Sequence, residues 1–333
     1  MNKLLSIAIP AYNISSYIDK IVDSLISIKM KDMIEIIIVN DGSKDNTLEL
    51  AYDYKEKYPD CIIVIDKENG GHGSTINSAI DVATGKYFKV IDGDDWVDSE
   101  QLDLLMNSLV TVDDDMLICN YVLYYDDNGE QKKESDIPIG MEVNKTYSIN
   151  EFCRKSTNPC TFHSSYFKTD IYKKSRKIDE NCFYVDVEYV LFPLKNVKTV
   201  RMMDYYVYIY RIGREGQSVS LDSYMKNKNN LITVVRSLLL FIKEKGMSDE
   251  IINYVVLRIK YLFRTILSIY FLIGKKREAN LYLKSLIIDI KRNYPMVYKK
   301  IKNKKLIFVK LFNFNGYYFK YYLLKYTNKL GLR

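Results

Sequence analysis

Three short apolar runs near the start of the chain each end in a cluster of turn-forming or acidic residues. They read SIAIPAYN at 6–13, IIIVNDGSKDNT at 36–47 and KVIDGDDWVD at 89–98, and segments with helical periodicity lie between them. Such β-branched runs predict strands buried on both faces, and their alternation with helices predicts an α/β fold whose sheet is mostly parallel, with helices on both faces. Ligands of such sheets bind beyond the carboxyl ends of the strands, where the three clusters fall.

The third cluster is the most acidic. Asp92, Asp94 and Asp95 lie within four residues, and Gly93 separates the first two. Carboxylates this close repel one another unless a cation joins them, and two of them can bind one Mg²⁺ or Mn²⁺ that keeps open positions for phosphate oxygens. For an isolated cluster, the alternative is a polar loop that caps the next helix.

The other strand ends carry groups suited to a nucleotide. Asp41 follows a strand, where its carboxylate can accept a hydrogen bond from a base N–H or a ribose hydroxyl. Tyr12 ends the first strand, where its ring either covers a flat heterocycle or packs against the fold. Residues 69–77, NGGHGSTIN, form a glycine-rich turn whose backbone N–H groups can approach a ligand. The histidine of this turn, His72, either touches phosphate or acceptor or has neither role.

In this order and spacing, the motifs resemble glycosyltransferase family 2, with its GT-A fold, over about residues 4–222. The resemblance rests on a Pro-x-Tyr-Asn-like motif at 10–13, an Asp-Gly-Ser-x-Asp motif at 41–45, the segment 69–77 and the Asp-x-Asp of 92–94. One departure is the Thr-Ile pair that precedes Asn77, where the family commonly has Ala-Arg.

The resemblance implies a role for each matched residue. Ala11, Tyr12 and Asp41 would hold the nucleoside, typically uridine. Asp94 would be the principal ligand of Mn²⁺ or Mg²⁺, with Asp92 as a second ligand. The residues expected to bind the nucleotide sugar are Pro10, Ala11, Tyr12, Asn13, Asp41, Gly71, Gly73, Asp92, Gly93, Asp95, Arg211, Arg214 and Ser218.

Inverting transfer needs one general base to take the proton of the acceptor hydroxyl. The family usually carries it in a Glu-Asp motif at the start of a helix, and the matching segment here is YVDVE at 184–188. Asp186 and Glu188 are two residues apart, so on a helix they point to different faces and only one can serve. The resemblance favours Asp186 as the base and places Glu188 and Trp96 on the acceptor side. The alternative is that these acids only form the solvated start of a helix and have no catalytic role.

Residues 210–218, which include Arg211 and Arg214, resemble the Tyr-Arg…Gly-Gln-Ser segment near the end of many such catalytic domains. Arginine recognises phosphate oxygens in a planar, bidentate manner, so Arg211 or Arg214 would steady the leaving diphosphate; the alternative is a surface loop. The Gln-x-x-Arg-Trp motif of processive synthases is missing, which indicates transfer of a single sugar.

The charge of the chain is unevenly distributed. Residues 1–225 hold 25 Lys and Arg against 37 Asp and Glu, whereas residues 226–333 hold 24 against 5, a net charge of +19. The basic region is also rich in apolar and aromatic residues, which is typical of helices in a membrane interface. The alternative is that this region forms a helical bundle or a homo-dimer surface.

We expect three regions in the chain: a nucleotide-sugar-binding half at 1–115, an acceptor-binding and catalytic-base half at 116–225, and the basic, helical region at 226–333.

The sequence thus predicts a metal-dependent, inverting glycosyltransferase that moves one sugar from a UDP-sugar to a glycan or lipid-linked acceptor in bacterial surface polysaccharide synthesis. One alternative is a sugar-nucleotide nucleotidyltransferase, but SIAIPAYN lacks the glycine-rich, basic strand-end loop of that class. Another is a non-catalytic protein that binds membrane or nucleic acid through the tail, which leaves the acidic cluster unexplained. We therefore expect no nucleic-acid partner.

Five cysteines without CxxC spacing and no apolar run of spanning length suggest the cytoplasm, with peripheral attachment to the inner face of the membrane.

Overall fold

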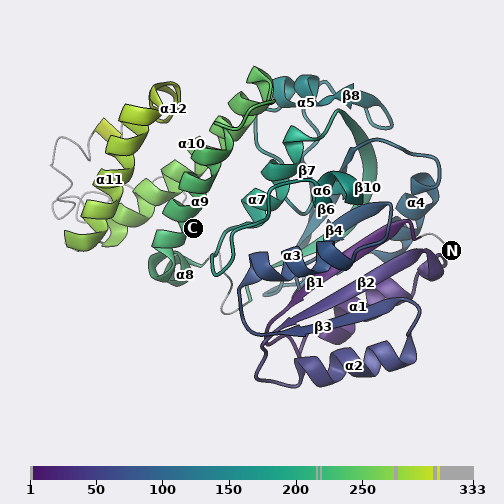
Figure 1. Cartoon of the computed structure of the whole chain (residues 1–333). Helices are drawn as coiled ribbons and strands as arrows, with labels where there is room; N and C mark the ends of the chain where they lie inside the picture. Colours follow the sequence, from purple (N-terminus) through teal and green to yellow (C-terminus); the bar gives the residue numbers. More distant parts are fainter. Residues whose placement is uncertain (1–2, 215–216, 218–219, 274–276, 303–305, 308–333) are drawn as a thin grey trace. The chain divides into compact units, whose positions relative to one another are not determined.

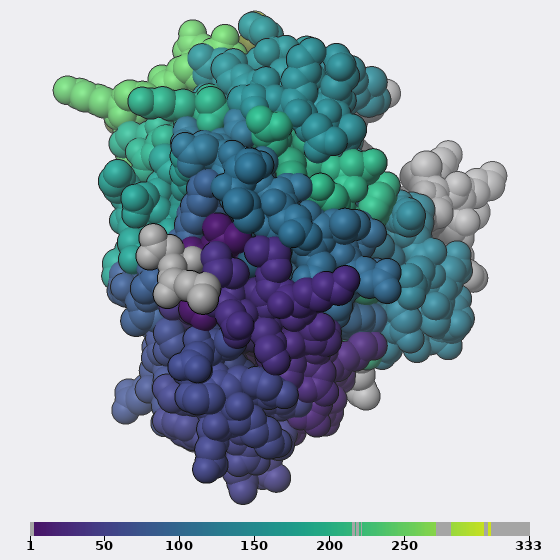
Figure 2. Space-filling view, turned by 90° about the vertical axis from the view of Figure 1, so that its right-hand side faces the viewer, coloured from purple at the N-terminus to yellow at the C-terminus, as the bar shows by residue number. Residues whose placement is uncertain are grey.

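The computed structural model describes residues 3–214, 217, 220–273, 277–302 and 306–307. The chain forms two compact units. The first comprises Met1–Glu215 and Lys245–Tyr254, and the second comprises Gly216–Glu244 and Val255–Arg333. Within the first unit, Figure 2 shows the N-terminal residues, in purple and blue, packed against the teal residues that follow them in the sequence.

The first four long strands form the parallel part of one sheet, in the order β3-β2-β1-β4. The helices of this part lie on both faces: α1 and α2 pack together on one face, and α3 covers β1 and β2 on the other (Figure 1). The elements are β1 (Leu5–Ala11), α1 (Ile18–Ile26), a 3₁₀ turn η1 (Lys31–Met33), β2 (Ile34–Asp41), α2 (Thr47–Lys57), β3 (Ile62–Lys67), α3 (His72–Val82) and β4 (Tyr87–Val90).

Beyond β4 the same sheet continues through β9, β6, β10 and β5. β9 runs antiparallel to β4 and β6, whereas β6 and β10 are parallel. The elements are β5 (Trp96–Val97), α4 (Ser99–Leu109), β6 (Met116–Tyr125), β7 (Gln131–Ser135), β8 (Thr146–Ser148), α5 (Ile149–Lys155), β9 (Ser165–Lys168), α6 (Thr169–Lys173), α7 (Asp186–Leu191), the 3₁₀ turn η2 (Phe192–Lys195) and β10 (Thr199–Ile212). The predicted α/β class is confirmed, and the predicted parallel pairing is found in β3-β2-β1-β4 and in β6-β10.

The core of this unit follows from the apolar pattern of the sequence. Every residue of β2 is buried, as a central strand covered by helices on both faces requires. The helix α1 buries Ile18, Ile21, Val22 and Leu25, which recur at helical spacing. Each such side chain contributes roughly 1.5–3 kcal/mol through removal from water, so the strand ends that follow β1, β2 and β4 rest on a rigid base.

The described part of the C-terminal region is helical, as predicted. The helices are α8 (Leu221–Lys226), α9 (Lys228–Phe241), α10 (Asp249–Ile273), α11 (Arg277–Asn293) and α12 (Pro295–Ile301), and α10 starts within the first unit. In the part of the chain that the structure describes, no helix combines the length and the apolar composition needed to cross a membrane. The longest helix, α10, carries Arg258, Lys260 and Arg264 in its apolar stretch.

Candidate functional site

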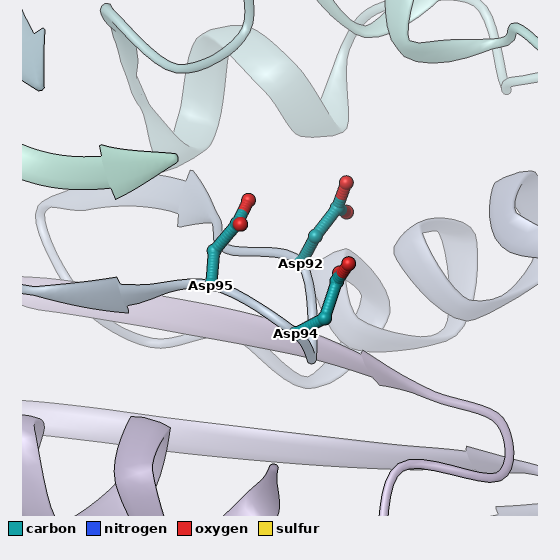
Figure 3. Close-up of side chains that lie close together, drawn as sticks. All are labelled: Asp92, Asp94 and Asp95. Carbon is teal, nitrogen blue, oxygen red and sulfur yellow. The ribbon is translucent and has the colours of Figure 1, made fainter. Parts of the chain in front are cut away.

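The three acids of the third motif come together in the loop between β4 and β5. Asp92, Asp94 and Asp95 each offer one carboxylate oxygen, and these oxygens lie within 4.8 Å of one another. Figure 3 shows the three side chains pointing to the same side of the loop. Hard divalent cations prefer carboxylate oxygens, so this donor set fits Mg²⁺ or Mn²⁺, as predicted for Asp92 and Asp94.

Each acid of this triad also has a partner from another part of the chain. Asp92 Oδ1 lies 2.9 Å from Nε2 of His72, the first residue of α3. Asp94 accepts a hydrogen bond from the guanidinium of Arg214. Asp95 accepts hydrogen bonds from the hydroxyl of Tyr208 at 2.5 Å and from the backbone N–H of Arg211 at 2.8 Å. The loop is therefore fixed from two sides, by α3 and by the end of β10.

The electrostatics of the triad favour an added cation. Burial, together with the charges of Asp94 and Asp92, raises the pKa of Asp95 well above its usual range. Burial alone would also raise the pKa of Asp92, but the charge and the hydrogen bond of His72 outweigh it and lower this pKa. A divalent cation among the three carboxylates would relieve the repulsion that Asp95 experiences.

Asp41 lies at the end of β2 and organises the glycine-rich turn. Only 2% of Asp41 is exposed, and its carboxylate accepts hydrogen bonds from the backbone N–H groups of Gly70 at 2.9 Å and Gly71 at 2.8 Å. The ammonium group of Lys67, at the end of β3, lies 2.9 Å from the same carboxylate. Asp41 thus holds the turn in place, and its contact with a nucleoside stays a prediction.

The first motif, residues 10–13, ends in two exposed residues, Tyr12 and Asn13. Tyr12 is 52% exposed, so its ring is accessible to a flat ligand. Asn13 adopts a φ of 52°, and its side chain accepts the N–H of Lys44, which joins the first motif to the second. Pro10 lies under the acid loop: a Cβ on Gly93 would come within 2.9 Å of the Pro10 carbonyl oxygen. Glycine at 93 therefore lets the third motif approach the first.

The glycine-rich turn also supports the segment that leads to α7. The side chain of Asn77 donates to the carbonyl of Ile178 at 2.9 Å and accepts the N–H of the same residue at 3.0 Å. The N–H of Asn181 donates to the carbonyl of Gly70 at 2.6 Å. A Cβ on Gly73 would lie 2.2 Å from the Asp179 carbonyl oxygen, so only glycine allows this approach.

Replacing Gly73 with alanine should therefore lower the free energy of unfolding. Alanine gains about 1 kcal/mol of helix propensity over glycine, but the clash with Asp179 displaces backbone, and overpacking of this kind typically costs about 1–3 kcal/mol. The loss is measurable by urea denaturation. Ser78→Ala, in the same helix, is the matched control and should leave stability nearly unchanged. A Gly73→Ala protein as stable as the wild type would contradict the close approach.

The two acids of the YVDVE segment have different environments. Asp186 is the first residue of α7 and is half-buried. Its charge acts on His72 and on Tyr210, which places it near the triad. Glu188 is fully buried, and its carboxylate accepts the N–H of Asp179 at 2.8 Å. Glu188 thus supports the segment before α7, and its predicted place on the acceptor side stays a prediction.

Trp96, predicted to face the acceptor, is only 8% exposed. It packs with Val122 and Ile209, and Nζ of Lys20 lies 3.3 Å from the centre of its ring. The structure therefore places Trp96 under a lysine side chain rather than at an open acceptor surface. Its predicted contact with an acceptor is not tested by these contacts, but it would require Lys20 to move.

The two arginines after β10 lie over the acid loop. Nε of Arg211 donates to the backbone carbonyl of Asp94 at 3.0 Å, and its guanidinium pairs with Asp126 at 2.7 Å. Arg214 pairs with Asp94, and its guanidinium carbon lies 5.3 Å from the centre of the Tyr17 ring. Both side chains thus lie against the acid loop, and their contact with a diphosphate stays a prediction. Ser218, predicted to join them, lies outside the described residues.

Comparison with known proteins identifies the family. A family model described as Glycosyl transferase family 2 matches residues 6–176, just over half of the chain. The chain belongs to glycosyltransferase family 2. The matched residues of this family 2 chain include the acid triad, Asp41 and the glycine-rich turn, and they end ten residues before Asp186.

Curated relatives match this family 2 chain over part of their length. The uncharacterised glycosyltransferase EpsJ of Bacillus subtilis is 29% identical over 222 residues, which are 63% of this chain and 62% of EpsJ. The minor teichoic acid biosynthesis protein GgaB of the same organism is 26% identical over 250 residues, which are 72% of this chain and 26% of GgaB. The chain therefore spans less than two thirds of the length of these relatives.

Solved structures share the fold of this family 2 chain. Staphylococcus aureus TarS 1–349 in complex with UDP-GlcNAc has a TM-score of 0.64 and 18% identity, covering 90% of this chain and 83% of TarS 1–349. The mannosyltransferase PcManGT of Pyrobaculum calidifontis, in complex with GDP-Man and Mn²⁺, has a TM-score of 0.53 and 14% identity, covering 94% and 87%. At these identities the likeness concerns the fold, and it confirms the predicted GT-A architecture.

Sequence reasoning missed two side chains of this family 2 site and left a third without a role. Tyr208 and Lys67 were not assigned, and His72 was left open, yet they contact Asp95, Asp41 and Asp92 respectively. Tyr208 and Asp95 are 113 residues apart, so no local pattern pairs them. The only sequence signal is the spacing of two tyrosines in β10, which predicts that Tyr208 and Tyr210 share one face of a strand.

Proposed function

We propose that this protein transfers a single sugar from a UDP-sugar, with Mn²⁺ or Mg²⁺, to a glycan or lipid-linked acceptor with inversion at the anomeric carbon. One observation carries the proposal: the segment that ends at Asp186 rests on the glycine-rich turn, and the histidine of that turn, His72, contacts the acid triad. The candidate base and the candidate metal site are therefore both held by contacts with the glycine-rich turn.

On the donor side, Asp94 and Asp92 would hold the ion, which supplies positive charge to the diphosphate. The nucleoside would lie along the ends of β1 and β2, over Tyr12 and beside Asp41. Arg211 and Arg214 would bind the phosphate oxygens and stabilise the charge that develops on the leaving group. The UDP-GlcNAc of the TarS structure and the GDP-Man and Mn²⁺ of the PcManGT structure support a nucleotide-sugar donor and a divalent ion.

On the acceptor side, Asp186 would take the proton of the attacking hydroxyl. The acceptor oxygen forms its bond to the anomeric carbon while the bond from that carbon to the diphosphate oxygen breaks, so the leaving group departs as nucleoside diphosphate. A carboxylate suits this role because its ionised form can accept the proton of the hydroxyl as the new bond forms. The half-buried position of Asp186 leaves it accessible to the acceptor.

Calorimetric titration of nucleotide sugars in the presence of Mn²⁺ tests the donor assignment. We expect micromolar to millimolar affinity for one UDP-sugar, and slow release of UDP from it when no acceptor is present. Failure to bind any nucleotide sugar would refute the proposal. Release of pyrophosphate from UTP and a sugar 1-phosphate would instead identify a nucleotidyltransferase.

We further propose that the second unit attaches the enzyme to the inner face of the cell membrane, where lipid-linked acceptors would be accessible. The helices α11 and α12 expose the apolar residues Leu281, Ile288 and Met296. Exposed lysines lie on the same two helices, and the whole region carries a charge of +19. An apolar face with basic residues is suited to a membrane surface that contains anionic lipids. The relationship to GgaB, named for teichoic acid biosynthesis, supports a role in cell-surface polymers.

Sedimentation with vesicles of phosphatidylglycerol and phosphatidylcholine tests this attachment. The full-length protein should sediment with anionic vesicles at low salt. Joint replacement of Lys284, Lys291 and Lys299 with glutamine should weaken binding strongly, since each lysine near an anionic surface contributes about 1 kcal/mol. The matched control replaces Lys57, Lys132 and Lys174, exposed lysines of the first unit. Equal binding by both variants, or none by the wild type, would exclude the membrane surface and favour a bundle or dimer surface.

A further inference from the structure

Tyr210 lies on β10 beside a residue that already serves the acid triad. Tyr208 and Tyr210 are two positions apart on one strand, so their side chains share a face of the sheet. The hydroxyl of Tyr208 donates to Asp95 at 2.5 Å and accepts the backbone N–H of Asp92 at 3.1 Å. Tyr210 is one step nearer the open end of the strand, where Arg211 and Arg214 follow.

The ring of Tyr210 is held in one orientation. It stacks on the imidazole of His163, with ring centres 4.2 Å apart and an angle of 29° between the planes. His163 also contacts Tyr208 edge-on at 4.9 Å. The carbonyl of His163 accepts a hydrogen bond from the buried ammonium of Lys89 at 2.7 Å, which fixes the backbone behind this stack. The position of the Tyr210 hydroxyl is therefore set before any ligand binds.

This hydroxyl is available, in contrast to that of Tyr208. Among the residues that the structure describes, none forms a hydrogen bond with the Tyr210 hydroxyl, and the residue is half-buried. Burial and the charges of Asp95, Asp92, Asp94 and Asp186 raise the pKa of Tyr210, so the phenol stays protonated and can donate. The four acids that act on it are the three of the triad and the candidate base.

We propose that the Tyr210 hydroxyl donates a hydrogen bond to an oxygen of the transferred sugar and thereby helps to select the donor. The inference rests on the proposed function. Under the proposed function, the transferred sugar would lie between the diphosphate and the base, and the acids of both sites act on Tyr210. A neutral donor is suited to this position, since an added carboxylate would be repelled by the four acids and sugar oxygens accept hydrogen bonds readily.

Calorimetry with UDP and with the UDP-sugar that the wild type binds most tightly, both in Mn²⁺, tests the inference on the full-length protein. Tyr210→Phe keeps the stack on His163 and removes only the hydroxyl. It should leave the affinity for UDP unchanged and weaken binding of the UDP-sugar about 5- to 10-fold, the usual effect of one lost hydrogen bond.

Two further tyrosines provide matched controls. Tyr208→Phe removes the hydroxyl that bonds Asp95, so it should weaken UDP and the UDP-sugar alike. Tyr121 contacts the ring of His163 at 5.3 Å, and Tyr121→Phe should leave both affinities unchanged. The contrast between these three variants separates contact with the sugar from support of the triad.

Two outcomes would overturn the inference. They are equal weakening of UDP and the UDP-sugar in Tyr210→Phe, and unchanged UDP-sugar binding; if transfer is then slower, the hydroxyl lies against the acceptor instead. A wild-type protein that binds no nucleotide sugar would instead refute the proposed function itself. The two failures are therefore distinguishable.

Discussion

Replacing Asp94 with alanine should reduce Mn²⁺-dependent hydrolysis of the donor, and transfer from it, by at least about 10³-fold. Asp94 is the predicted principal ligand, and its loss removes one of three carboxylates that lie within 4.8 Å of one another. Several kilocalories per mole of charge stabilisation on the diphosphate would be lost with the ion. The measurement is release of UDP from the UDP-sugar across a Mn²⁺ titration.

The fold should survive the Asp94→Ala substitution. Loss of one carboxylate lowers the repulsion within the triad, so the thermal midpoint should change little, and circular dichroism can verify this. Asp53→Ala, at an exposed position of α2, is the matched control and should retain wild-type activity. Retained Mn²⁺-dependent activity in Asp94→Ala would refute the metal assignment.

Replacing Asp186 with asparagine should remove transfer while donor binding persists. The amide has nearly the same shape as the carboxylate but cannot take the proton of the acceptor hydroxyl, and general-base catalysis contributes typically about 10²–10⁴-fold. We expect kcat for transfer to fall within this range, with an unchanged dissociation constant for the UDP-sugar in calorimetry.

The neighbouring acid distinguishes the role of Asp186 from general damage to α7. Glu188→Gln keeps the shape of the buried side chain and an oxygen that can accept the N–H of Asp179. It should therefore affect stability more than transfer. Full transfer activity in Asp186→Asn would refute the assignment of the base, whichever way Glu188→Gln behaves.

Sequence reasoning predicted the structure of residues 1–115 better than that of residues 116–225. Burial patterns and strand-end motifs are local, so they located β1, β2, β4 and the acid triad correctly. The partners of the triad are not local: Arg214 is 120 residues from Asp94, and His72 is 20 residues from Asp92. Such pairs depend on how the sheet closes, which periodicity does not specify.

The residues predicted to serve as base or to face the acceptor show a second limit of sequence reasoning. Spacing alone indicated that only one of Asp186 and Glu188 could serve as base, but burial separates the two: Glu188 lies fully inside the fold. Trp96 was expected near the acceptor because of its position in the motif, whereas Lys20, from a helix 76 residues earlier, covers its ring. In both cases a tertiary contact decides the environment of a residue whose motif was recognised.

The pairing of Asp94 with Arg214 has a consequence for the catalytic cycle. Under the proposed function, an ion held by Asp94 would take the place of a guanidinium that already neutralises this acid. Metal binding would then exchange one cation for another, and the lost ion pair would reduce its net free energy. The same pair can form again when metal and nucleoside diphosphate depart, which favours product release and returns the acid loop to its resting arrangement.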